Sequence, residues 1–323
     1  MAKSKRGSGP RPGSNRAERV AARKERQAAT VAAPARPFQT LPAAECDLVA
    51  LRAFVASASA QVSFASGFDA PNEADWVTIL PGAVPGIVRQ RLGAIWGEKG
   101  GNAGDADGKV TQGLVGLQTD PEPADLTGSL AAALTWAASA EPDAKFEAPS
   151  DVTKIEEIVD PSAPLKIMVY EDFEWWFGDD ADSIPPQAKA MLEQANATIM
   201  PTSRMKPKSC TGAPWWVHAG AKAHLRWVRP EDENALMDAL AKVNAAGSLT
   251  LGEGSRFAGS FRTHGLLVPV FDLDPEKHSQ EWQEGLDAFD AAVTQALADT
   301  SELTAAERSA RKGIIGRQVT LRV

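Results

Sequence analysis

The 323-residue sequence contains only two cysteines, Cys46 and Cys210. Two cysteines at this spacing fit neither a disulfide framework nor a zinc knuckle, so we expect a reducing compartment. No apolar run approaches the roughly 20 residues that cross a bilayer, and no apolar segment of a secretion signal follows the basic N-terminus. We therefore expect a cytoplasmic protein without membrane contact.

The sequence also lacks the motifs that would specify a reaction or a cofactor. The nearest approach to a nucleotide-binding P-loop, from Gly104 to Lys109, lacks the first glycine at the right spacing and has Val110 where Ser or Thr is needed. No set of residues has a recognisable metal-ligand spacing. We expect no cofactor and no metal, catalytic residues stay unknown, and the interpretation leans away from an enzyme.

Charge is divided unevenly along the chain. Residues 1–36 hold ten of the 34 Lys and Arg residues but two of the 42 acidic ones, a net charge of +8 against −16 for the remainder. A positive segment attracts phosphate-rich partners that a negative body repels. We predict an arm that contacts RNA or ribosomes; the alternative is a tail that only keeps the protein soluble. The candidate nucleic-acid-binding residues are Lys3, Lys5, Arg6, Arg11, Arg16, Arg19, Arg23, Lys24 and Arg26.

Apolar periodicity predicts a mixed α+β fold, with mainly antiparallel sheets and packed helices. We expect a disordered basic arm over residues 1–36, a first α+β unit over 37–160, and a second over 161–323 that ends in helices. Segments 114–137 and 224–243 both read as strand, Pro-acid turn and helix. The two units are therefore either a duplication or a chance likeness. The acidic body, residues 37–323, offers a surface for a protein partner.

Local patterns predict individual elements of this fold. Thr304 and Glu307 form the capping box of a last helix, and a helix is expected to begin near Pro85. Further helices are expected over 43–55, 126–140, 186–196, 230–247 and 279–299, and strands over 75–80, 109–119, 165–177, 198–203 and 265–273.

The stretch from Trp215 to Val228 reads as a hairpin. For its apolar residues to share one face, residue 218 must pair with residue 224 across a three-residue loop, 220–222. This register places His218 opposite His224 and leads to two interpretations. The two imidazoles either share a metal ion or lie on a polar sheet face beside Arg226.

The glycine-rich connection LGEGSRFAGS (251–260) is the other candidate site. It either wraps an anion, with Arg256, Arg262 and His264 as ligand-binding side chains, or only permits tight backbone turns. These residues carry the alternative function, an enzyme or a binder of a small molecule or nucleotide.

Three segments carry a resemblance to a known family: HLRWVRPEDE (224–233), LTLGEGSRFAGSFRTHGLLVPVFDL (249–273) and ERSARKGIIGRQVTLR (307–322). They resemble an actinobacterial family of uncharacterised proteins, a domain of unknown function whose members begin with a short basic arm. Some members bear the label of a preprotein translocase ATPase, which this sequence does not support because it has no P-loop. The resemblance implies no catalytic residues.

Overall fold

The structure is a computed structural model that describes residues 36–81, 83–92, 109–119, 122–149, 153–177, 184–208 and 211–320. The nine candidate nucleic-acid-binding residues of the arm lie outside the described residues. Only Arg36, the last residue of the predicted arm, falls within them.

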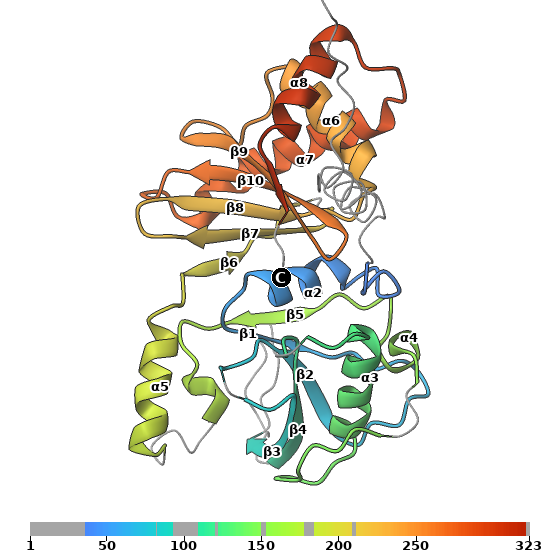
Figure 1. The fold of residues 1–323 in the computed structure, drawn as a ribbon, viewed down its shortest axis with the longest axis vertical. Helices are drawn as coiled ribbons and strands as arrows, with labels where there is room; N and C mark the ends of the chain where they lie inside the picture. The colour runs from blue at the N-terminus through green and yellow to red at the C-terminus, as the bar shows by residue number, and fades with distance from the viewer. Residues whose placement is uncertain are drawn as a thin grey trace, which may run out of the picture. The chain divides into compact units, whose positions relative to one another are not determined.

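The first half of the described chain forms a five-stranded sheet, in the order β3-β4-β2-β1-β5 (Figure 1). β2 and β4 run parallel, and the other neighbours run antiparallel. The strands are β1 (Ala58–Gln61), β2 (Glu73–Val77), β3 (Gly86–Leu92), β4 (Lys109–Gly116) and β5 (Lys166–Val169).

The second half forms a six-stranded sheet, in the order β11-β9-β10-β8-β7-β6. Only β11 and β9 run parallel. The mixed, mainly antiparallel α+β fold predicted from the sequence is therefore confirmed. The strands are β6 (Thr202–Arg204), β7 (Ala213–His218), β8 (Ala223–Val228), β9 (Ser255–Thr263), β10 (Leu266–Leu273) and β11 (Gln318–Thr320).

Helices cover the faces of these sheets. α2 packs on β7 and β8, whereas α3 packs on β4 and β3. Thr304 and Glu307 form the predicted capping box of α8. The helices are α2 (Glu45–Ala53), α3 (Leu126–Ala137), α4 (Ile155–Ile158), α5 (Pro186–Asn196), α6 (Glu233–Ala245), the 3₁₀ helix η2 (Ser279–Trp282), α7 (Gln283–Ala298) and α8 (Ala305–Ile315).

The helix predicted to begin near Pro85 is wrong, because these residues form the edge strand β3. Each residue from Gly86 to Leu92 pairs with a residue of β4, and the Pro85 carbonyl accepts a hydrogen bond from the Gly116 amide. Pairing with residues 17 to 29 positions away outweighs the helical spacing, which is a weak local preference.

The predicted register of the β7–β8 hairpin is also wrong. His218 pairs with Ala223, and His224 pairs with Val217. Trp215 therefore shares a face with Arg226, while Trp216 shares the other face with Leu225. The prediction assumed that one face of the hairpin is buried and the other exposed.

Both faces of β7 and of the end of β8 are in fact covered, whereas His224 and Arg226 of β8 are partly exposed. On one side, Trp215 and Val228 belong to the same buried cluster as Leu48 of α2. On the other side, Trp227 packs with α6 and α7, and its ring lies 5.7 Å from that of Phe289. Figure 1 shows α6, α7 and α8 gathered on this second side. Apolar side chains are buried at both odd-numbered and even-numbered positions, so the alternation of apolar and polar residues in the sequence does not fix the register.

The division between the sheets falls between β5 and β6. β5 completes the first sheet by pairing with β1, and Leu192 of α5 packs with Val77 and Leu114 of that sheet. The boundary that the sequence analysis places between two α+β units, at residues 160 and 161, stays a prediction.

We expect Gly285→Ala to destabilise the protein by about 1–3 kcal/mol, the usual cost of overpacking. Gly285 lies in α7, and a Cβ there would stand 2.0 Å from the Leu251 carbonyl oxygen. Gly313→Ala is the matched control, because a Cβ at this position of α8 meets nothing within 4 Å and the helix gains up to about 1 kcal/mol. Urea denaturation measures both; a stabilised Gly285→Ala protein would contradict the packing.

Candidate functional site

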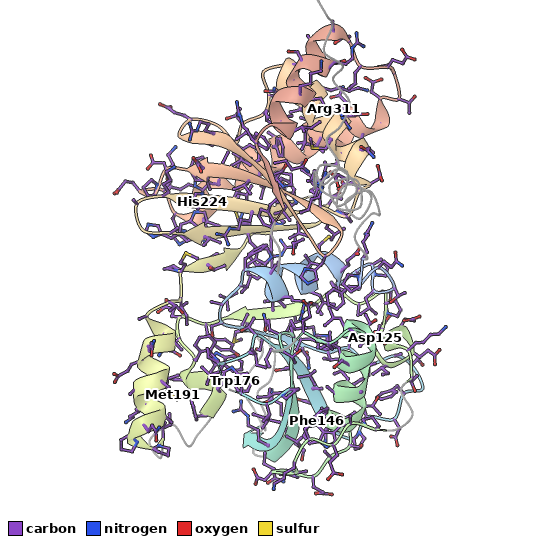
Figure 2. All side chains as sticks on the ribbon, viewed as in Figure 1. Asp125, Phe146, Trp176, Met191, His224 and Arg311 are labelled. Carbon is purple, nitrogen blue, oxygen red and sulfur yellow. The ribbon has the colours of Figure 1, made fainter. Side chains whose placement is uncertain are left out.

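Asp272 of β10 gathers cationic side chains on one face of the six-stranded sheet. Strand register places it beside His224 of β8 and Arg256 of β9. Arg256 Nη2 donates to Asp272 Oδ2 at 2.8 Å, and Lys222 Nζ lies 3.4 Å from the same oxygen. His224 Nδ1 lies 3.2 Å from Asp272 Oδ1. Figure 2 labels His224 on this sheet.

These neighbours change the protonation of both central groups. Burial lowers the pKa of His224, and the positive charges of Arg226 and Lys222 add to this effect against the pull of Asp272. Burial opposes ionisation of Asp272, but hydrogen bonds from Arg256 and Lys222 outweigh it and lower the pKa of this carboxyl. Near neutral pH the cluster therefore holds a neutral imidazole and an ionised carboxylate.

Arg226 lies two residues after His224 on β8 and on the same face of the sheet. Its guanidinium carbon lies 5.3 Å from the centre of the Phe54 ring, and the side chain is half-buried. Within the part of the chain that the structure describes, no carboxylate or hydrogen-bond acceptor is placed against this guanidinium. Burial accordingly lowers the pKa of Arg226 without an opposing partner.

His264 lies in a different place, in the turn between β9 and β10. Its φ of +48° is uncommon for a residue other than glycine. Its Nε2 accepts a hydrogen bond from Arg52 Nε at 2.8 Å, which puts the imidazole proton on Nδ1, 2.8 Å from Thr263 Oγ1. Burial, helped by the positive charge of Arg52, lowers the pKa of His264 to about 4.

Arg52 is itself fully engaged at this junction. It is a buried residue of α2 that also donates to the Leu117 carbonyl and to the Glu122 carboxylate. This network joins α2, the segment after β4 and the β9–β10 turn. Both imidazole nitrogens of His264 are occupied, so the arrangement is suited to holding these segments together.

The remaining two candidates lie apart from both places. Arg262 donates from Nε to both carboxylate oxygens of Glu233 at 2.7 Å. The His218 ring lies 5.8 Å from that of Trp216, on the opposite face of the sheet from His224. The predicted cross-strand pair of histidines is therefore wrong.

Residues 251–254 of the glycine-rich connection (251–260) form a hydrogen-bonded turn, and residues 255–260 belong to β9. Ser255 Oγ lies 2.8 Å from the Leu251 amide nitrogen and 2.7 Å from the Gly252 carbonyl oxygen. Gly252 and Gly254 have φ values of +104° and +86°, which glycine adopts at little cost. The hydroxyl of Ser255 is therefore used within the turn.

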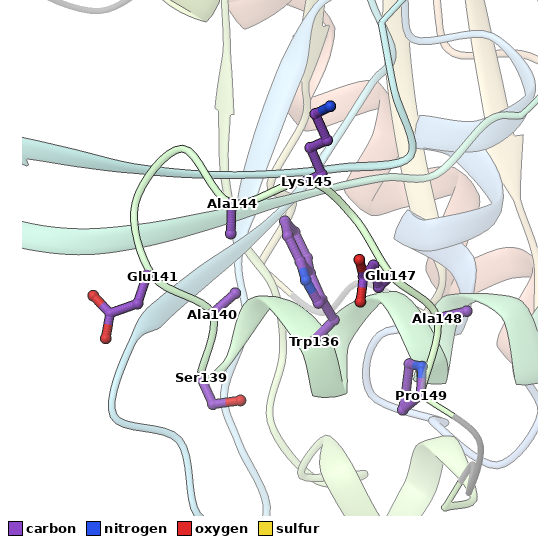
Figure 3. A pocket seen from close by; sticks show the side chains of 9 residues that line it. All are labelled: Trp136, Ser139, Ala140, Glu141, Ala144, Lys145, Glu147, Ala148 and Pro149. Atoms are coloured by element: carbon purple, nitrogen blue, oxygen red, sulfur yellow. The ribbon is translucent and has the colours of Figure 1, made fainter.

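Hollows in the surface lie elsewhere. An open one of about 530 Å³ surrounds Trp136, and Figure 3 shows the side chains that line it, Glu141, Lys145 and Glu147 among them. A second, of about 340 Å³, lies under α5 and is lined by apolar side chains. A third, of about 560 Å³, lies at the glycine-rich connection, between residues 250–253 and α7, and its lining does not include Arg256, Arg262 or His264. None of the three is lined by Asp272 or by the cationic residues beside it.

Among the residues that the structure describes, no three His, Cys, Asp or Glu side chains are grouped to hold a metal ion. No helix in the same ranges combines the length and apolar character needed to cross a bilayer.

The sequence predictions named His224 and Arg256, which the structure brings together, but missed the groups that complete the cluster. Lys222 was assigned only to the loop of the hairpin. Asp272 gave one signal, because it is the single acid in the otherwise apolar strand GLLVPVFDL. A carboxylate in such a strand requires a cationic or hydrogen-bonding partner.

The model of a family of unknown function, DUF5926, matches residues 37–322. The chain belongs to the DUF5926 family. The resemblance to a domain of unknown function is thereby confirmed, and Asp272 with its partners Lys222, His224 and Arg256 lies within the DUF5926 match. Residues 1–36 precede the matched range. No curated protein and no solved structure matches the chain.

Proposed function

We propose that this protein is a cytoplasmic binding protein that contacts RNA, free or within ribosomes, through residues 1–36. The observation that carries the proposal is the net charge of +8 in these residues against −16 in the remainder. Lysine and arginine neutralise phosphates and release counterions, which gives affinity without base recognition. The segment contains no aromatic residue, so base stacking contributes nothing there. The acidic body offers its surface to a protein partner.

Ion pairs within the body support the assignment of RNA contact to residues 1–36. Arg204 is paired with Asp47, Arg262 with Glu233, and Arg311 with Asp238. Arginines neutralised in this way have less charge to offer a polyanion. Arg36, where the arm joins the body, donates from Nε to Glu45 Oε1 at 2.9 Å and fixes this end of the arm to α2.

The alternative, a small-molecule or nucleotide site at the glycine-rich connection, receives less support. Arg256 contacts Asp272, Arg262 contacts Glu233, and His264 contacts Arg52. A shared pocket requires these side chains to point toward one another. Their partners lie on three different elements, so we propose no reaction for the connection.

Deletion of residues 1–35 is expected to abolish salt-sensitive binding to single-stranded RNA and co-sedimentation with ribosomes. Replacement of the nine candidate Lys and Arg residues by glutamine tests charge without shortening the chain. Each phosphate contact contributes about 0.7 to the slope of log affinity against log salt for a single strand, and this slope should fall toward zero. Arg311→Gln, in the body, is the matched control.

Unchanged RNA affinity in both arm variants would overturn the proposal. A pull-down compared with and without nuclease separates the two kinds of partner. Partners captured through RNA disappear on nuclease treatment, whereas a protein bound to the acidic body remains.

A further inference from the structure

Lys222 and Arg256 contact the carboxylate of Asp272, and a third cation, Arg226, lies two residues after His224 on the same face of β8. We call Lys222, Arg226 and Arg256, together with His224 and Asp272, the Asp272 cluster. We propose that the Asp272 cluster binds a phosphate group, and that this group belongs to the RNA backbone. The assignment of this group to the RNA backbone rests on the proposed function, whereas the binding of a phosphate group follows from the geometry of the cluster.

The local charge of the cluster is opposite to that of the body. Lys222, Arg226 and Arg256 carry three positive charges and Asp272 one negative charge, while the body outside the arm carries −16. His224 adds a neutral ring with Nδ1 directed at Asp272. A net positive site on a negative surface attracts an anion over a short range only, because salt screens the field beyond about 10 Å.

Arg226 supplies the observation that points to a ligand. A guanidinium has five N–H donors, and those of a half-buried arginine without a protein acceptor are open to water or to a ligand. Across the described residues, this guanidinium has no hydrogen-bond or ion-pair partner, and it lies over the Phe54 ring. Phe54 is itself held edge-on against Phe261, with ring centres 6.3 Å apart. An aromatic ring contacts a guanidinium face and leaves its N–H edge free for an oxyanion.

The other two cations are placed to complete the site. The side chains of Arg256 and Lys222 are 76% and 59% exposed, and both contact the same oxygen of Asp272. Exposed ion pairs of this kind are weak, so their charged ends can turn from Asp272 to a phosphate at little cost. Arginine binds a phosphate through two parallel N–H groups, a geometry that lysine lacks. We therefore expect Arg226 to be the main contact and Lys222 to add charge.

The choice of a phosphate over a cation follows from the role of Asp272. Its carboxylate is already shared by Arg256, Lys222 and His224, and it is the only acid among the causes of the pKa shift of His224. In the unliganded protein Asp272 takes the place of an anion. A bound phosphate ester, with one or two negative charges, takes over part of this role as the anionic partner of Arg256 and Lys222. The same cationic residues therefore have an anionic partner with and without the ligand.

The test uses the full-length protein and three probes: inorganic phosphate, adenosine monophosphate and a single-stranded oligoribonucleotide. Phosphorus NMR titration measures the first two, and fluorescence anisotropy measures the third. Arg226→Gln is expected to weaken phosphate binding at least tenfold, and Arg226→Lys to weaken it less. Asp272→Asn removes the competing carboxylate and is expected to strengthen phosphate binding several-fold. Arg311→Gln should change nothing.

RNA affinity should fall about three- to tenfold in Arg226→Gln, with the salt slope reduced by about one contact. Unchanged phosphate affinity in Arg226→Gln, or no gain in Asp272→Asn, overturns the site. Loss of phosphate binding with unchanged RNA affinity overturns the RNA assignment alone. Failure of the proposed function is distinct, because it appears as unchanged RNA binding in the arm deletion. Thermal melting confirms that each variant is folded.

Discussion

Arg229→Met is expected to destabilise the protein by about 3–5 kcal/mol, the cost of breaking a buried ion pair from one side. Arg229 is 1% exposed and donates from Nη1 to Asp290 Oδ1 at 2.6 Å, and Asp290 is 2% exposed. A second carboxylate, Glu231, contacts the same guanidinium. Removing the arginine leaves the Asp290 charge buried in α7 without its partner.

Urea denaturation measures this loss as a lower midpoint with an unchanged slope. The double variant Arg229→Met, Asp290→Leu is the matched control, because it removes the orphaned charge together with its partner. We expect it to recover part of the stability. A single variant within about 0.5 kcal/mol of the parent would show that water reaches the pair and compensates for the loss, against the burial described above.

Stability is expected to fall as the pH is lowered from about 6.5 toward 4, because of His264. Its pKa is lowered from 6.5 to about 4 in the folded protein, so the unfolded chain binds a proton in this interval and the folded one does not. The contribution is complete above pH 6.5 and is lost on acidification. It amounts to at most about 3.5 kcal/mol, since each pKa unit corresponds to about 1.4 kcal/mol.

The physical cause is the hydrogen bond from Arg52 Nε, 2.8 Å from His264 Nε2. Protonation converts this acceptor into a donor that faces another donor and another positive charge. His264→Asn preserves the left-handed turn, which asparagine tolerates, and removes the titrating group. Denaturation from pH 7 to 4.5 should show a shallower decline for the variant than for the parent. Parallel declines would contradict the assignment.

Local patterns predicted the elements whose stability is local. The Thr304–Glu307 capping box and the spacing of Trp282, Leu286 and Phe289 each depend on contacts within one helix, and the structure confirms both. The mixed α+β class also followed, since it depends on the sum of such elements.

Elements that depend on distant partners were not predictable from the sequence. β3 exists because β4 pairs with it, and the register of β7 with β8 is set by two cores on opposite sides. The Asp272 cluster combines residues from three strands, so finding it requires the register of β8, β10 and β9 together. The sequence identified His224 and Arg256 separately as candidate site residues, but it did not show that both lie beside Asp272.

The burial of β7 on both sides has a consequence for how this sequence tolerates change. In an ordinary half-exposed strand, every second position accepts polar side chains freely. Here Trp215 and Trp216 are neighbours in sequence, both are buried, and they belong to different cores. Mutational tolerance along β7 therefore has no period of two, and this strand constrains helices on opposite sides of the sheet at the same time.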